Sequence, residues 1–128
     1  MKKSASTFAL AALFAGASLP ALAQTWTVDA SHSAVGFSVR HMMVSNVKGT
    51  FDKFAASVEG DPADPSKAKI SATIEVASVN TRDAKRDEHL RAPDFFDAAK
   101  FPQMTFVSTK VEKVSAAKAK VTGNLTLR

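Results

Sequence analysis

Apolar side chains recur at every second position through most of this chain. The stretch 70–76 shows the pattern with mostly branched side chains: Ile70, Ala72, Ile74 and Val76. Successive side chains of a strand point to opposite faces, so a period of two places the apolar residues on one face. The pattern predicts a mainly β protein, an antiparallel sheet or barrel with one apolar face.

The apolar pattern changes parity near Asp52 and Lys53. Phe51 belongs to one alternating set and Phe54 to the other, which is typical of a β-bulge or a sharp bend. The segment 61–66 predicts a turn, because it is rich in Asp and Pro. With separate strands around 103–108 and 111–115 and a last one over 119–127, we expect about six strands.

Residues 1–23 have the features of a secretory signal peptide. Lys2 and Lys3 precede a short uncharged apolar run, and the small-residue pattern Ala21-Leu22-Ala23 follows it. The apolar run is too short to cross a bilayer. We predict cleavage after Ala23 and export to a bacterial periplasm.

Residues 24–128 are expected to form one domain. Removing Lys2 and Lys3 from 17 basic residues leaves 15 against 12 acidic ones, so the charge is only mildly positive. No basic run with interleaved aromatic residues is present, and no nucleic-acid partner is predicted. The chain has no cysteine, which excludes thiol chemistry and disulfides.

The segment RDAKRDEHLRAPDFF, residues 82–96, is much more charged than the rest of the chain. Thr81 is the predicted N-cap, and Pro93 predicts that the helix ends near Ala92. On a helical wheel, a cationic stripe lies within about 60°: Arg82, Arg86 and His89. Arginine suits phosphate because its planar group donates two parallel hydrogen bonds. A clamp for an anion and a solvated surface helix both remain open.

The other charged side chains of this segment are expected to be solvated. Asp83 and Asp87 lie among other charged residues, so the sequence does not indicate an acid–base pair with contrasting pKa values. Asp87 and Arg91 are four residues apart, so we expect them to pair on the helix surface.

No combination of residues specifies a reaction. His32, His41 and His89 could in principle hold a zinc ion, but their spacing matches no metal motif. Ser33 follows His32 on what we take to be a strand, where neighbouring side chains point apart. No catalytic residue, metal ligand or cofactor is therefore predicted. A histidine-dependent metal enzyme or hydrolase is the alternative.

Four segments in order resemble the YceI family, lipocalin-like periplasmic proteins associated with polyisoprenoid lipids. They are WTVDASHSAVGFSVRH, KGTFDKF, ATIEVASVNTRDAKRDEHLRAPDFFDAAKFPQMTF and VTGNLTLR. Together they cover nearly all of residues 24–128. The resemblance implies a lipocalin-like antiparallel β-barrel with one short helical insertion and a lipid ligand.

Members of that family usually continue beyond the strand at which this chain stops. We therefore expect the barrel to be incomplete, with C-terminal strands missing and an unpaired edge. Such an edge would make the isolated chain poorly soluble or prone to exchange strands in a homodimer.

The predicted function is non-enzymatic binding or carriage of a polyisoprenoid or similar long-chain amphiphilic lipid, with transient membrane contact. A fully packed interaction protein without a cavity is a further alternative. Alternation assigns the cavity for the lipid tail to Phe37, Phe51, Phe54, Ile74, Phe95, Phe96 and Phe106. The head group is assigned to Arg82, Arg86 and His89.

Overall fold

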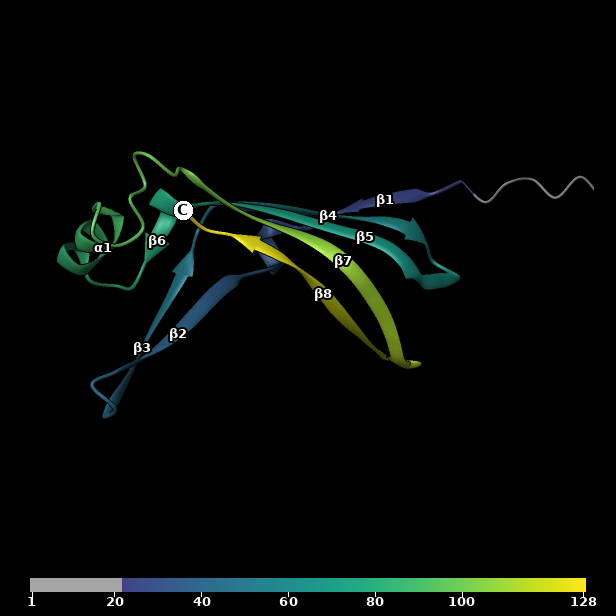
Figure 1. Ribbon diagram of the computed structural model, residues 1–128, viewed down its shortest axis with the longest axis horizontal. Coiled ribbons are helices and arrows are strands. Elements are labelled where there is room, and N and C mark those ends of the chain that lie inside the picture. Colours follow the sequence, from purple (N-terminus) through teal and green to yellow (C-terminus); the bar gives the residue numbers. More distant parts are fainter. Residues whose placement is uncertain (1–21) are drawn as a thin grey trace, which may run out of the picture.

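The computed structural model describes residues 22–128 (Figure 1). The signal peptide predicted at residues 1–23 lies outside this range, apart from its last two residues. The described elements are β1 (Gln24–Thr27), η1 (Ala30–His32), β2 (Val35–His41), β3 (Ser45–Phe51), β4 (Phe54–Asp61), β5 (Asp64–Glu75), η2 (Val76–Ser78), β6 (Val79–Asn80), α1 (Ala84–Arg91), β7 (Gln103–Ser115) and β8 (Lys118–Thr126).

The strands form two antiparallel sheets. The larger has the order β1-β4-β5-β7-β8, and the smaller has the order β2-β3-β6. The prediction of a mainly β, antiparallel protein with one short helix is confirmed. The expected strands at 103–108 and 111–115 are one strand, β7, while β1 and β6 were not predicted because they have only four and two residues.

The predicted bend at Asp52–Lys53 is confirmed, and it is where the chain changes sheet. Strand β3 ends at Phe51 in the smaller sheet, and β4 begins at Phe54 in the larger one. The amide of Asp52 donates to the carbonyl of Ser78 at 3.1 Å, which holds the bend against η2. The change of parity in the sequence therefore marks a corner between two sheets.

Strand register places the apolar residues of the larger sheet on one face, because directly paired residues point to the same side. The pairing Phe54–Ile74–Met104 crosses β4, β5 and β7. Further along, the same face is made by Trp26–Val58–Ile70 and by Ala72–Phe106–Leu125. The opposite face carries mainly Thr, Ser, Glu and Lys.

A register shift in β7 between Ser108 and Lys110 reverses the parity of this strand. As a result Val111, at an odd position, is buried and pairs with Val121, whereas Met104 and Phe106 lie at even positions. The shift inserts one extra residue into β7, so a single strand covers the two segments that the sequence pattern predicted as separate strands.

The buried core is small and lies where the two sheets meet. Its members are Phe51, Ile74, Val76, Val79 and Met104. Helix α1 lies beside β6 at this end, and the β2–β3 hairpin diverges from the larger sheet (Figure 1). The described strands thus form an open arch and not a closed barrel. No helix within residues 22–128 is long and apolar enough to cross a membrane.

Candidate functional site

The inner side of the arch is lined by aromatic side chains from several elements. The rings of Phe37 and Phe51 lie 5.5 Å apart, and the ring of Phe96 meets Phe51 edge-on at 5.8 Å. These residues come from β2, β3 and the loop after α1. The smaller sheet and the helical segment therefore share one aromatic cluster.

Five of the seven residues predicted to hold a lipid tail belong to the hydrophobic core or pack against it. Phe51 and Ile74 are buried in it, and Phe37, Phe54 and Phe96 pack against it. The other two, Phe95 and Phe106, are not members. Phe95 is exposed on the helical segment, and Phe106 lies further along the inner face. The assignment to a tail cavity stays a prediction.

Two phenylalanine rings lie directly against glycines of neighbouring strands. A Cβ atom on Gly123 would lie 2.5 Å from Cζ of Phe106, and one on Gly49 would clash with the ring of Phe37. Glycine at both positions leaves room for each ring to approach the adjacent backbone closely.

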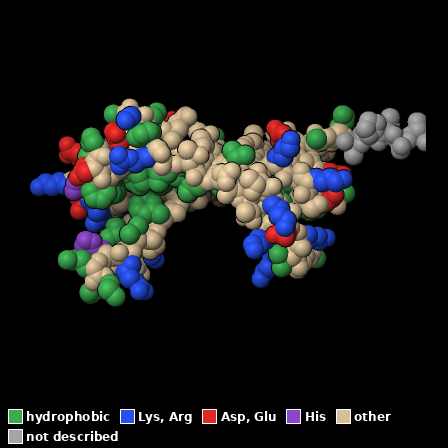
Figure 2. Space-filling model, in the orientation of Figure 1, with side chains coloured by type: hydrophobic (Ala, Val, Ile, Leu, Met, Phe, Trp, Pro, Cys, Tyr) green, Lys and Arg blue, Asp and Glu red, His purple; other side chains and the backbone are tan. Residues whose placement is uncertain are grey.

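The apolar face continues beyond the core and remains exposed there. Leu125 is 59% exposed, and Trp26 and Val121 on the same face are also accessible. Figure 2 shows hydrophobic side chains gathered on the underside of the arch, at the end that holds α1 and the smaller sheet. A contiguous exposed apolar surface is typical of an interaction or ligand site.

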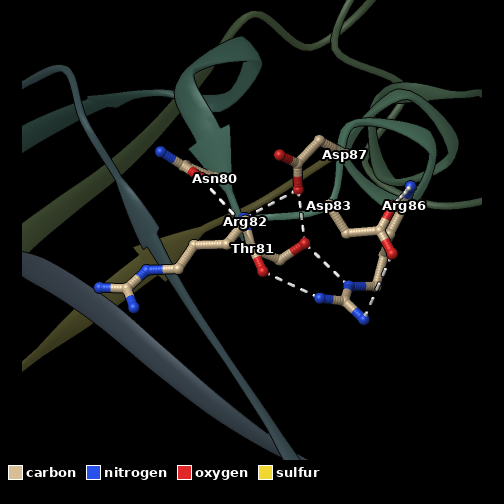
Figure 3. Close-up of polar contacts among 6 residues, drawn as sticks. All are labelled: Asn80, Thr81, Arg82, Asp83, Arg86 and Asp87. Atoms are coloured by element: carbon tan, nitrogen blue, oxygen red, sulfur yellow. Dashed lines mark hydrogen bonds and ion pairs between the residues drawn. The ribbon is translucent and has the colours of Figure 1, made fainter.

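The charged segment after β6 begins with a polar network (Figure 3). Asp83, and not Thr81 as predicted, is the N-cap of α1, and its carboxylate accepts from the amide of Arg86 at 3.1 Å. Thr81 is buried and donates to Asp87 from its amide (2.8 Å) and its hydroxyl (2.6 Å). Asp87 is also buried, so the expectation of a solvated carboxylate is wrong.

The two arginines of α1 hold the helix against the preceding chain. Arg86 donates to the hydroxyl and the carbonyl of Thr81, both at 2.8 Å. Arg91 donates to the carbonyls of Ala77 (2.8 Å) and Val79 (3.2 Å). The expected pairing of Asp87 with Arg91 is wrong, because both side chains instead tie α1 to the preceding chain.

Arg82 differs from Arg86 in its surroundings. Its backbone is in the left-handed region (φ 64°), and its amide donates to the side chain of Asn80 at 3.0 Å. Its side chain points away from Arg86 (Figure 3). It lines a hollow of about 490 Å³ together with Lys48, Gly49, Thr50, Asp52 and Asn80.

A carboxylate, that of Asp52, lines this hollow. Asp52 accepts from Asn80 at 2.9 Å and from the hydroxyl of Thr50 at 2.8 Å. These hydrogen bonds, first that of Asn80, lower the pKa of Asp52 because they favour the charged form. Lys48 and Thr50 lie on the face of β3 opposite to Phe51, so the hollow is on the outer side of the smaller sheet.

His89, the third residue predicted to bind a head group, already has partners. Its Nε2 lies 3.1 Å from a carboxylate oxygen of Asp94, and its ring packs edge-on against Phe95 at 4.7 Å. The hydrogen bond with His89 is the main cause of the lowered pKa of Asp94. Arg82, Arg86 and His89 therefore have separate partners and do not converge, and their role in head-group binding stays a prediction.

The three histidines lie in different elements. His32 belongs to the turn η1 and not to a strand as expected, and its Nδ1 is 2.7 Å from Asp29 and 3.0 Å from the hydroxyl of Ser31. In a Ser-His-Asp triad the two partners use different ring nitrogens, whereas here both use Nδ1. Hydrogen bonds, first that of Ser31, lower the pKa of Asp29. In the part of the chain that the structure describes, no group of three or more His, Asp or Glu could hold a metal ion.

Two antiparallel sheets, a short helix and an open apolar inner face define a lipocalin-like β protein. The YceI-like domain model matches residues 26–128, and this chain belongs to that family. The family resemblance predicted from the sequence motifs is confirmed.

Several relatives share this region. A UPF0312 protein of Staphylococcus aureus strain USA300 is 44% identical over 103 residues, and the match covers 80% of this chain and 57% of the relative. The solved BcnA of Burkholderia cenocepacia is 37% identical with a TM-score of 0.72, over 78% of this chain and 62% of BcnA. The solved YceI protein of Campylobacter jejuni is 46% identical with a TM-score of 0.62, over 80% and 60%. The chain thus spans about three fifths of the length of these relatives.

Sequence reasoning missed two features of this surface. Trp26 lies on the inner face through its pairing with Val58, but β1 is too short for alternation to reveal it. Met42, Met43 and Val44 form the exposed tip of the β2–β3 hairpin. Three consecutive large apolar residues at the end of a predicted strand were the available signal.

Proposed function

We propose that the chain belongs to a periplasmic protein that binds the hydrocarbon tail of a polyisoprenoid or similar long-chain amphiphilic lipid and catalyses no reaction on it. The observation that supports this is the apolar inner face. It runs from the buried Phe51 cluster to the exposed Leu125 and Trp26 across the larger sheet.

A long apolar tail matches this surface physically. Removing hydrocarbon from water is favourable by about 0.8 kcal/mol for each CH₂ group. The face is elongated and carries aromatic rings at several positions, so it offers contacts along an extended chain. The lipocalin-like fold of the family is consistent with a ligand between the sheets.

An anionic head group would be bound by the cationic residues of the segment after β6. Arg82 is the freest of the three proposed residues, because Arg86 is engaged with Thr81 and His89 with Asp94. A phosphate at Arg82 would gain a charge-assisted contact.

The direct experiment is to purify the full-length chain from the periplasm, extract it with organic solvent and analyse the extract by mass spectrometry. We expect a polyprenyl lipid or a related long-chain amphiphile in a fixed ratio to protein. Metal analysis of the same preparation addresses the alternative, because stoichiometric zinc or iron would favour a histidine-dependent enzyme.

The chain offers a matched pair of variants for this experiment. Leu125 lies on the inner face and is 59% exposed, while Val107 lies on the outer face of the adjacent strand and is 55% exposed. Leu125→Asp should lower the lipid content, and Val107→Asp should leave it unchanged. Equal lipid content in both variants, or no lipid in the parent protein, would contradict the proposal.

A further inference from the structure

The tip of the β2–β3 hairpin presents large apolar side chains to solvent. Met42, Met43 and Val44 are 82%, 87% and 90% exposed. The hairpin extends away from the junction of the two sheets, so its tip is a protrusion (Figure 1). Three adjacent apolar residues at a protruding turn form a surface suited to contact with another apolar phase.

The backbone of this turn does not favour methionine. Met42 and Met43 have φ angles of 50° and 59°, and the amide of Val44 donates to the carbonyl of His41 at 3.2 Å. Positive φ at both central positions is the feature of a type I′ turn, for which Asn-Gly is the preferred sequence. Turn geometry therefore does not account for methionine at these positions.

The flanks of the tip are cationic. Residues 33–51 contain Arg40 and Lys48 but no Asp or Glu. Both cations lie on the outer face of the hairpin, at positions alternating with those of the inner phenylalanines, and Arg82 lies near Lys48 in the outer hollow. An apolar tip with basic flanks is complementary to a bilayer that carries anionic lipids.

The opposite end of the molecule is basic as well, but it lacks this combination. The turn between β7 and β8 has alanines, Ala116 and Ala117, beside Lys113 and Lys118. Alanine offers little apolar surface for insertion, and Val114, 65% exposed, is a single large apolar residue near this turn. Positive charge alone therefore does not distinguish the two ends. The large side chains of Met42, Met43 and Val44 do.

We infer that the tip of the β2–β3 hairpin docks on an anionic membrane surface. Met42, Met43 and Val44 insert between the lipid head groups, and Arg40 and Lys48 contact the lipid phosphates. Methionine suits this role because its flexible thioether chain adapts to an irregular apolar partner. This inference is independent of the proposed function, since it concerns the bilayer itself and no ligand on the inner face.

The test measures binding of the full-length chain, as purified after export, to vesicles without polyisoprenoid. One set contains phosphatidylcholine with about one third phosphatidylglycerol, a composition that gives the negative surface the inference requires. The main variant is Met42→Asn/Met43→Gly, which removes the apolar side chains and supplies the preferred turn sequence. We expect at least a tenfold loss of binding, roughly the contribution of one buried methionine, with no loss of thermal stability.

Control variants elsewhere on the surface test whether a loss of vesicle binding is specific to the apolar and the charged residues of the tip. Val114→Ser removes an exposed apolar side chain elsewhere and should leave binding unchanged. Arg40→Gln/Lys48→Gln should weaken binding several-fold to anionic vesicles, while Lys113→Gln/Lys118→Gln should have a smaller effect.

Three results would overturn the inference. The first is unchanged vesicle binding by Met42→Asn/Met43→Gly, and the second is an equal loss in Val114→Ser. The third is a concentration-dependent dimer that this double variant abolishes while the parent chain binds no vesicles. That result would assign the tip to a second copy of the chain.

Discussion

The centre of the apolar face of the larger sheet, at the junction with the smaller sheet, and its edge strands share a sequence pattern but differ in what covers them. At the junction, Ile74 and Met104 are buried beneath the smaller sheet and the segment after α1. On the edge strands β8 and β1, Leu125 and Trp26 continue the same alternation and remain exposed. Alternation thus identifies a face, but packing decides which part of that face is core and which part is free to bind.

The polar groups at the junction are also buried and paired. At the junction, Thr81 and Asp87 are buried and hydrogen-bonded to each other. Within residues 22–128, no buried side-chain polar atom lacks a hydrogen-bond partner. The polar groups of the junction are therefore part of a completed structural core.

Removing the central ring of the junction should have the largest effect on stability. Phe51 is 5% exposed and contacts two other rings, so Phe51→Ala should lower the free energy of unfolding by about 3–5 kcal/mol. Leu125→Ala on the exposed part should change it by less than about 0.5 kcal/mol. Urea denaturation of both variants measures the difference. Similar losses would mean that the junction and the edge strand are equally packed.

The buried carboxylate of α1 should have the next largest effect. Asp87→Ala leaves the buried amide and hydroxyl of Thr81 without an acceptor, at a cost of about 2–3 kcal/mol. The adjacent Glu88 is exposed, so Glu88→Ala is the matched control and should stay within about 0.5 kcal/mol. Thermal unfolding followed by circular dichroism distinguishes the two. A near-neutral Asp87→Ala would show that α1 is held in another way.

The two arginines at 82 and 86 should both affect head-group binding but differ in their effect on stability. Arg82→Ala should weaken binding of a polyprenyl diphosphate about tenfold and leave binding of the uncharged alcohol unchanged, since a hydrogen bond to a charged group contributes about 1.5–3 kcal/mol. Arg86→Ala should also weaken diphosphate binding, and it should lower stability by about 1–2 kcal/mol because it loses its bonds to Thr81.

Parallel titrations with the diphosphate and the alcohol measure these effects. Equal losses for both ligands, or no loss for either, would show that the head group is bound elsewhere.

The smallest expected effect concerns the outer hollow. Asn80→Ala removes the main cause of the lowered pKa of Asp52, so this pKa should rise toward its ordinary value of 3.8. A pKa lower in the folded than in the unfolded state stabilises the fold above the unfolded value, and this contribution disappears as the pH falls through the folded value. An NMR titration of the Asp52 carboxyl measures the change. An unchanged pKa would contradict the assigned network.

Local patterns predicted much of the fold. The parity change between Phe51 and Phe54 marked the corner between the sheets, and Pro93 marked the end of α1 at Arg91. These features depend on neighbouring residues, and the sequence displays them directly. The shift in β7 was visible in the same way, since Met104 and Val111 have opposite parity, but it was interpreted as two separate strands.

The candidate site was harder to predict from the sequence because it depends on contacts between distant elements. A helical wheel placed Arg82, Arg86 and His89 on one stripe, but Arg82 precedes the helix in a left-handed conformation. The burial of Asp87 depends on Thr81 folding back against α1. Residue spacing within one segment can show neither the left-handed conformation of Arg82 nor the contact between Thr81 and Asp87.

The most direct test of the proposed lipid-binding face uses Trp26, the single tryptophan of the chain. It lies on the inner face at the end away from the core, so a bound tail that runs along the face should reach it. Titration with a long-chain lipid brominated along its tail should quench Trp26 fluorescence saturably in the parent and in Val107→Asp, and only weakly in Leu125→Asp. Equal quenching in all three proteins, or no saturable quenching in the parent, would contradict binding along this face.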